Sequence, residues 1–281
     1  MCLSSRAVGR ISNAWRLAQA SWQVLSRDRE LIAIPIIAGI GSLLAFGVIA
    51  GQGVLLLGGP DDTNAGDVAL WLILALAAVA ATWVAALGQA EVVAGAGQRM
   101  DGGDPTLATA FDASRARSGR LFGWAVLATV VALVLDQIQE RLGLAGRIIG
   151  SLGKLAFSVM SFLALPVIVF ENVGPIDGFK RSSQLLRSTW GEQITFSFGM
   201  GLLGFLAALP GIAVGGGAAA SGVLIVQVVG VAVAVAWVIA VIAVVSALSA
   251  VYKTALYRWA SKLPVDPAFD ESDLTGAFRR R

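Results

Sequence analysis

Six long stretches of apolar residues follow one another along the chain, separated by short polar segments. They cover residues 31–57, 68–90, 121–135, 148–170, 193–214 and 221–251. A helix needs about 20 apolar residues to cross a hydrocarbon core about 30 Å thick. The third stretch is short but is lengthened by weakly polar flanks, and the sixth is long enough that it must tilt or extend beyond the bilayer. The pattern predicts an all-α, polytopic membrane protein with six transmembrane helices.

Shorter segments between these stretches have apolar and aromatic residues at helical spacing, with arginine and lysine beside them. This pattern is typical of amphipathic helices that lie in the lipid headgroup layer. Near the start, Ile11, Trp15, Ala18, Trp22 and Leu25 form one such face, and Arg16 lies off it. The two later segments comprise Ile176, Phe179, Leu186 and Trp190 with Lys180, Arg181 and Arg187, and Tyr252, Leu256, Trp259 and Leu263 with Lys253, Arg258 and Lys262.

These helices can be interpreted in two ways. They bind anionic lipid or a partner protein, or they only anchor the spans, as interfacial Trp and Tyr do in many membrane proteins. The chain then divides into an N-terminal amphipathic helix in residues 1–30, a six-span domain in residues 31–251, and a C-terminal amphipathic helix and tail in residues 252–281. The order of these segments predicts a unit of one interfacial helix followed by a transmembrane hairpin, used three times. Ala110, Phe111, Ser114, Phe122 and Gly123 match Gly178, Phe179, Ser182, Trp190 and Gly191 at identical spacing.

Charged residues are few and unevenly placed. They make up 14% of the chain, against about 25% in soluble domains. Of the 21 lysines and arginines, only Arg141, Arg147 and Lys154 lie outside the two terminal segments and the second and fourth loops. Because cytoplasmic loops are enriched in lysine and arginine, both termini are predicted to be cytoplasmic.

Composition also excludes several kinds of chemistry. The chain has no histidine and a single cysteine, Cys2, which argues against His-dependent nucleophile systems, most zinc sites and an intramolecular disulfide. No phosphate-binding loop is present, and the basic residues line one membrane face rather than forming a nucleic-acid reader. We therefore expect a protein that is not an enzyme, with no cofactor, no metal and no nucleic-acid partner.

Polar groups near the membrane are candidates for function because burial in lipid is costly. Lys154 lies inside the fourth span near its outer end, where it can pair with Asp136 or Glu140 at the rim. Glu91 and Glu171 end the second and fourth spans on the cytoplasmic side. They either face each other, or meet Arg99 and Lys180, around a cytoplasmic vestibule, or they are solvated and salt-bridged as most span-terminal glutamates are.

Several segments resemble the DUF6159 family of prokaryotic six-span membrane proteins of unknown function. They are residues 10–17 with 21–22, residues 30–35, 170–175, 180–182, 190–192 and 255–260, and residues 269–270 and 276–278. The plan is also distantly similar to the membrane domains associated with glycerophosphodiester phosphodiesterases and to YciC-like proteins. The resemblance implies the fold, the topology and a prokaryotic cytoplasmic (inner) membrane, and it brings no catalytic residues.

The sequence thus leads to two function classes. The first is a non-enzymatic membrane protein that organises or assists lipids or partner proteins, as a homo- or hetero-oligomer, and contacts anionic headgroups on its cytoplasmic side. The alternative is a permease or channel subunit whose cytoplasmic mouth holds Glu91 and Glu171. A lipid-modifying enzyme has the least support, because no histidine, aspartate cluster or metal pattern accompanies it.

Overall fold

The computed structural model describes residues 2–28, 30–57, 64–187 and 193–269, and the side chains of these residues except 2–14, 64–67, 187, 193–200 and 202. Within this part of the chain all regular structure is helical, as predicted. The elements are α1 (Cys2–Arg27), α2 (Glu30–Leu57), α3 (Asn64–Met100), α4 (Leu107–Arg115), α5 (Ser118–Arg141), α6 (Gly143–Met160), α7 (Ala164–Glu171), α8 (Pro175–Arg187), α9 (Gln193–Ala219) and α10 (Leu224–Ala260).

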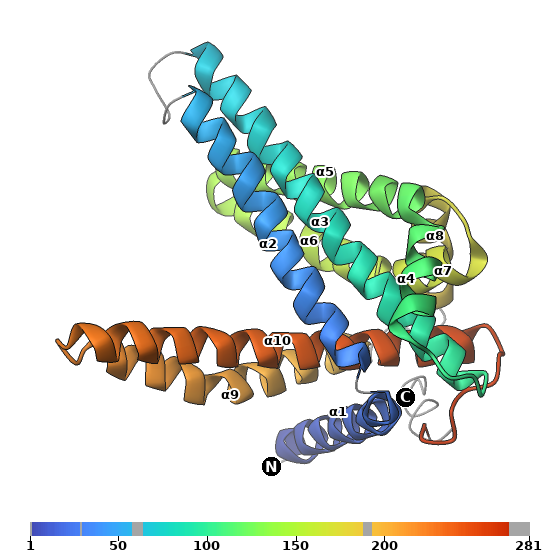
Figure 1. Ribbon diagram of the computed structural model, residues 1–281. Coiled ribbons are helices and arrows are strands. Elements are labelled where there is room, and N and C mark those ends of the chain that lie inside the picture. Colours follow the sequence, from blue (N-terminus) through green and yellow to red (C-terminus); the bar gives the residue numbers. More distant parts are fainter. Residues whose placement is uncertain (1, 29, 58–63, 188–192, 270–281) are drawn as a thin grey trace.

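Three helical hairpins, α2–α3, α5–α6 and α9–α10, extend from a common region toward the left of Figure 1 and diverge from one another. The tight turn between α5 and α6 contains Gly143 at φ +56°, and the turn before α10 contains Gly222 at φ +70°. Glycine suits both turns because a positive φ carries no Cβ penalty there. Each hairpin is therefore a local unit, and neighbouring hairpins meet from their bases up to mid-helix contacts such as that of Thr129 in α5 with Thr82 in α3.

The described residues contain five apolar segments long enough to cross a membrane: Glu30–Leu57, Val68–Met100, Ser118–Arg141, Gly143–Glu171 and Leu224–Ala260. A shorter apolar stretch, Leu203–Ala219, lies within α9. Large apolar side chains on these segments are exposed, among them Leu55, Leu144 and Leu224 at 85%, 79% and 73%. Such surfaces are stable in lipid rather than in water, so the protein is membrane-embedded. The fifth predicted span, residues 193–214, stays a prediction.

Helix packing within the hairpins depends on small residues at the contact. A Cβ added to Gly88 of α3 would lie 2.2 Å from Cβ of Ala38 in α2. In the third hairpin, a Cβ on Gly211 would lie 2.5 Å from the Trp237 ring, and one on Gly230 would lie 2.2 Å from Cβ of Ala218. Close backbone approach of this kind is how helices associate in lipid, where no hydrophobic force drives them together.

The short helices pack on the hairpins in a cyclic order. α4 contacts α2 and α3, α8 contacts α5 and α6, and α1 contacts α9 and α10. Each helix thus packs on the hairpin that precedes it in the chain, and α1 packs on the last one. The element order agrees with the predicted unit of one helix plus one hairpin, while a true internal repeat stays a prediction.

Three boundaries differ from the sequence prediction. The fourth span is interrupted at residues 161–163, so α6 and α7 are separate helices. The second span does not end at Glu91, because α3 continues to Met100. Up to residue 269, where the described part of the chain ends, no separate amphipathic helix follows the sixth span: α10 runs on to Ala260, and its Tyr252 and Leu256 are each only 1% exposed. Their aromatic and apolar spacing reflects contact with protein rather than with headgroups.

The core lies where the hairpins converge. Its fully buried side chains include Leu25 of α1, Leu31 of α2, Val92 of α3, Leu121 of α5 and Tyr252 of α10. Aromatic pairs extend it, such as Phe170 on Tyr257 with ring centroids 5.3 Å apart. Elements far apart in sequence are therefore joined at one end of the molecule.

Substituting Gly88 by alanine is expected to lower stability by about 1–3 kcal/mol, because the added methyl group forces α2 and α3 apart. Gly47→Ala is the matched control, since a Cβ on Gly47 meets nothing within 4 Å. Thermal unfolding of the detergent-purified variants measures both effects. Equal melting temperatures for Gly88→Ala and the wild-type protein would contradict the packing described here.

Candidate functional site

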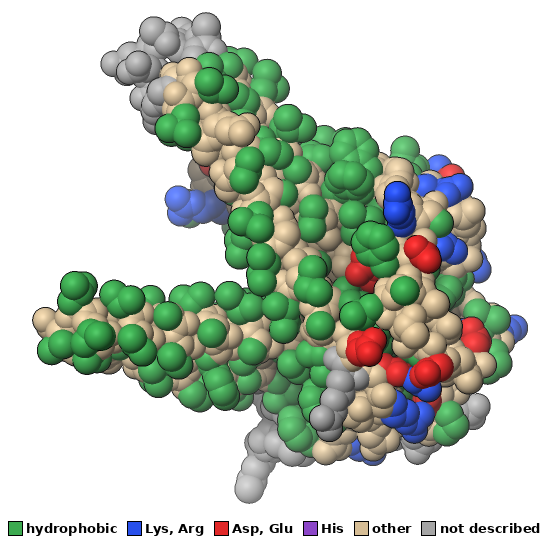
Figure 2. Space-filling view, viewed as in Figure 1, with side chains coloured by type: hydrophobic (Ala, Val, Ile, Leu, Met, Phe, Trp, Pro, Cys, Tyr) green, Lys and Arg blue, Asp and Glu red, His purple; other side chains and the backbone are tan. Residues whose placement is uncertain are grey.

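Most charged side chains in Figure 2 gather on the right, where the hairpins converge, whereas the first and third hairpins show mainly apolar side chains. They come from the α1–α2 junction, the C-terminal end of α3, the C-terminal end of α10 and the segment after α10. We call this cluster the polar base; it consists of Arg27, Asp28, Arg99, Asp101, Asp104, Arg258 and Asp266.

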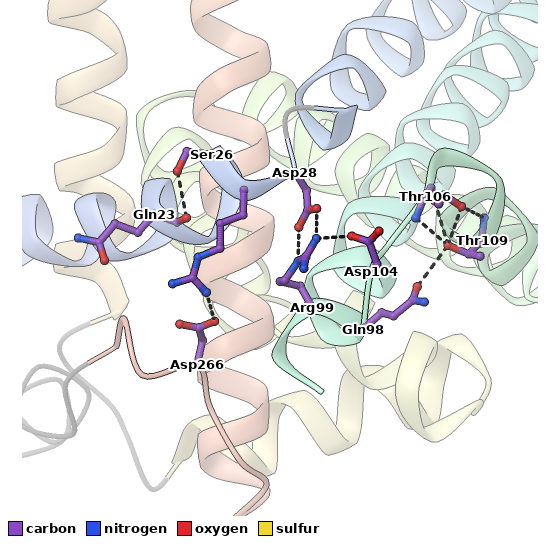
Figure 3. A network of polar contacts seen from close by, with 10 residues as sticks. Gln23, Ser26, Asp28, Gln98, Arg99, Asp104, Thr106, Thr109 and Asp266 are labelled. Carbon is purple, nitrogen blue, oxygen red and sulfur yellow. Dashed lines mark hydrogen bonds and ion pairs between the residues drawn. The ribbon is translucent and has the colours of Figure 1, made fainter. Parts of the chain in front are cut away.

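Arg99, in the last turn of α3, connects two acidic residues of the polar base (Figure 3). Its guanidinium donates to both carboxylate oxygens of Asp28 and, at 2.7 Å, to Oδ1 of Asp104. The two carboxylates differ in environment, since the Asp28 side chain is 7% exposed and that of Asp104 is 87% exposed. The bidentate, buried pair is the strong one, because bidentate geometry and low solvent access both strengthen an ion pair.

Arg258 forms the second connection within the polar base, and its position differs from the one predicted from the sequence. The sequence placed it beside lipid headgroups, but it is only 5% exposed. Its guanidinium pairs with Asp101 beyond the end of α3, and its Nε donates to the Pro264 carbonyl at 2.7 Å. Arg258 therefore fastens the end of α10 to the end of α3 and to the segment that follows α10.

Asp266 brings the C-terminal segment to α1. It accepts from the Arg27 guanidinium at 3.1 Å and from the Ala268 backbone N–H at 2.8 Å, and it is 5% exposed. Figure 3 shows Asp266 close to the end of α1 that carries Gln23 and Ser26. The polar base thus ties together α1, α3, α10 and the segment that follows α10.

The two glutamates predicted to line a vestibule belong to separate contacts. Glu171, at the end of α7, accepts from Nε of Arg181 and from the Tyr257 hydroxyl, both at 3.2 Å. Glu91, in α3, accepts from the Ser114 hydroxyl at 3.1 Å. Neither glutamate has Arg99 or Lys180 as its partner among the described contacts. A vestibule lined by both glutamates stays a prediction.

Two buried serines form hydrogen bonds with polar groups of neighbouring helices, a role that the sequence analysis did not predict. Ser182 of α8 is fully buried, donates to the Met160 carbonyl at 2.7 Å and accepts from the Leu163 N–H at 3.1 Å. It thereby satisfies backbone groups that the break between α6 and α7 leaves free. Ser114, its counterpart in the predicted repeat, is 1% exposed and binds Glu91. The matched spacing of these serines was the available signal.

Lys154 of α6 forms an ion pair with Asp136 of α5, one of the two partners expected from the sequence. Glu140 instead accepts from the Gln137 side chain at 3.5 Å. Both ion-pair side chains are about half exposed, so the pair lies on the surface of the second hairpin. Its position at the outer rim of the membrane stays a prediction.

The residues expected at the membrane interface differ in exposure, and their contact with the membrane stays a prediction. Trp15 and Trp22 of α1 are 52% and 46% exposed, whereas Ala18 and Leu25 of the same predicted face are buried. Among the other residues predicted to lie at the interface, the exposed ones are Arg16, Lys180, Arg181 and Lys262, and the half-buried ones are Phe179 and Trp259. Two more, Arg187 and Trp190, lie outside the described side chains.

The chain belongs to a family of unknown function (DUF6159), whose model matches residues 68–264. The comparison with curated proteins finds no match for the chain. The comparison with solved structures finds no match either. Within the described residues, no three acidic, cysteine or histidine side chains are grouped to hold a metal ion. The site is therefore defined by its own geometry, as an ion-pair network at one end of a membrane-embedded helical protein.

The two carboxylates on Arg99 are expected to differ sharply in energetic importance. Asp28→Asn removes the buried carboxylate of the bidentate pair with Arg99 and should cost about 3 kcal/mol. Asp104→Asn removes an exposed partner of the same guanidinium and should cost about 1 kcal/mol or less. Thermal unfolding in detergent compares them, and equal losses of stability would contradict the ranking by burial.

Proposed function

We propose that this protein is a non-enzymatic organising protein of the prokaryotic cytoplasmic membrane, which uses the end that carries the polar base to contact anionic lipid headgroups. In this proposal both termini and the polar base are cytoplasmic. The observation that carries it is the exposed aromatic and basic side chains at that end: Trp15 and Trp22 on α1, Lys180 on α8 and Lys262 after α10.

Helix α1 supports the proposal because its two faces differ. Leu17, Ser21 and Val24 are at most 3% exposed, and α1 packs against α9 and α10. The opposite face carries the half-exposed Trp15 and Trp22. A helix held by protein on one side and presenting tryptophan on the other is suited to the interfacial layer, where amphipathic rings are favoured.

The exposed lysines supply the charge preference. Anionic lipid attracts each lysine or arginine near its surface by about 1 kcal/mol. Lys180 and Lys262 are exposed, whereas Arg99 and Arg258 face acidic partners inside the protein. The basic excess that the sequence placed on one membrane face is thus divided: one part holds the fold together and another is available to lipid.

A partner protein or a second copy is suggested by the exposed apolar flanks of the diverging hairpins, which extends the proposal from lipids to proteins. The permease or channel alternative, in which Glu91 and Glu171 share a vestibule, has less support, because each of these glutamates has its own partners.

The test is a comparison of anionic and zwitterionic lipid binding by the full-length protein. Native mass spectrometry with phosphatidylglycerol and phosphatidylcholine of identical acyl chains should show preferred binding of phosphatidylglycerol. Lys180→Gln with Lys262→Gln should lower that preference about thirtyfold, given about 1 kcal/mol for each lysine.

Arg141→Gln with Arg147→Gln is the matched control, because it removes the same charge from the turn region of the second hairpin. This control variant should keep the wild-type preference. The proposal fails if the wild-type protein does not discriminate between the two lipids, or if both double variants lose the preference equally.

A further inference from the structure

A groove with a volume of about 490 Å³ runs between α2, α3 and α4. Its lining is apolar apart from one carboxylate, that of Glu91. Ile37, Leu107 and Phe111 line it and are 64%, 40% and 53% exposed, so the groove opens sideways from the protein. Because α2 and α3 are membrane-spanning by length and composition, the groove faces lipid rather than water.

The groove has a polar end and an apolar end. Glu91 lies eight residues before Arg99 of the polar base along α3, and the lining continues away from the base through Leu87 and Val84. At 1.5 Å per residue, Glu91 and Val84 are about 10 Å apart along the helix. On α2 the lining runs in parallel from Ile34 to Gly41. An occupant would therefore place a polar head near the base and a hydrocarbon chain along the hairpin.

Glu91 determines which charge the headgroup of the occupant carries. One of its oxygens accepts from Ser114 at 3.1 Å, and among the described residues the carboxylate takes part in no ion pair. Neither lysine nor arginine lines the groove. A carboxylate with no cation beside it, at the edge of hydrocarbon, is costly unless a cation or hydrogen-bond donor reaches it. It attracts an ammonium group and repels an anionic head.

We propose that the groove between α2, α3 and α4 binds an aminophospholipid, a membrane lipid whose headgroup ends in a primary ammonium. The ammonium donates to the Glu91 carboxylate, and one acyl chain lies along Ile37, Gly41 and Val84. Contact between the groove and the acyl chain adds little selectivity, because the surrounding lipid offers the acyl chain the same apolar environment. Selectivity comes from the charged pair. This site is separate from Lys180 and Lys262 and takes a different headgroup.

The test uses a phosphatidylethanolamine probe with a photoactivatable diazirine at the end of one acyl chain, added to the full-length protein. Adducts are mapped by mass spectrometry and counted on residues 34–41 and 84–88, rather than on Glu91 itself, because alkyl diazirines favour carboxylates. Unlabelled phosphatidylethanolamine should remove these adducts at least fivefold more effectively than phosphatidylglycerol with the same chains.

Three variants test whether the preference for phosphatidylethanolamine depends on Glu91 and on the groove. Glu91→Gln is isosteric, still accepts from Ser114, and should abolish the difference between the two competitors. Glu140→Gln, at an exposed glutamate of the second hairpin, should preserve it. Ala108→Phe, at an exposed position in the lining, should fill the groove and lower the adducts severalfold with either competitor.

The proposal is overturned if the wild-type protein forms no adducts on these two segments, if both competitors act equally on it, or if Glu91→Gln keeps the preference. Lys180→Gln with Lys262→Gln should leave the adducts unchanged. A groove preference that survives in this double variant while its phosphatidylglycerol preference is lost separates the two sites.

Discussion

The ion-pair network of the polar base, centred on Arg99 and Arg258, is the interaction on which the arrangement of the helices depends most. In lipid, no hydrophobic force brings transmembrane helices together, and close packing or polar contacts must do so. Within each hairpin, small residues such as Gly88 and Ala38 provide that packing. At the polar base, Arg99 at the end of α3 holds the buried Asp28 between α1 and α2, and so joins the two ends of the first hairpin to α1. Arg258 of α10 pairs with Asp101 beyond the end of α3, and so joins the third hairpin to the first.

The cyclic placement of α1, α4 and α8 complements these ion pairs. Each short helix covers the base of one hairpin, and α1 covers the base of the last hairpin although it opens the chain. Ser182 and Ser114 sit on two of these helices and satisfy polar groups of α6, α7 and α3. The base is thus compact and polar while the hairpins diverge, which leaves their apolar sides to lipid or to a partner.

Sequence patterns predicted the helical class, the membrane location, the family and most helix positions, because an apolar stretch of about 20 residues matches the length of a helix that crosses lipid. They could not separate a residue that faces lipid from one that faces protein. Tyr252 and Leu256 have the spacing of an interfacial helix but are buried. Arg258 is a basic residue beside aromatic residues, which is typical of a headgroup contact, but it binds Asp101 and the Pro264 carbonyl. The break at residues 161–163 was hidden because Phe162 and Leu163 are as apolar as their neighbours.

The central claim, a base on one side of the membrane and hairpin turns on the other, can be measured directly. Single cysteines replace Asp104, Glu140 and Ser221 in a Cys2→Ser background, and spheroplasts of an expressing bacterium are treated with a membrane-impermeant maleimide. Asp104→Cys, at the base, should react only after permeabilisation, whereas Glu140→Cys and Ser221→Cys, beside the turns, should react in intact spheroplasts. Reaction of all three cysteines from the same side would contradict the account.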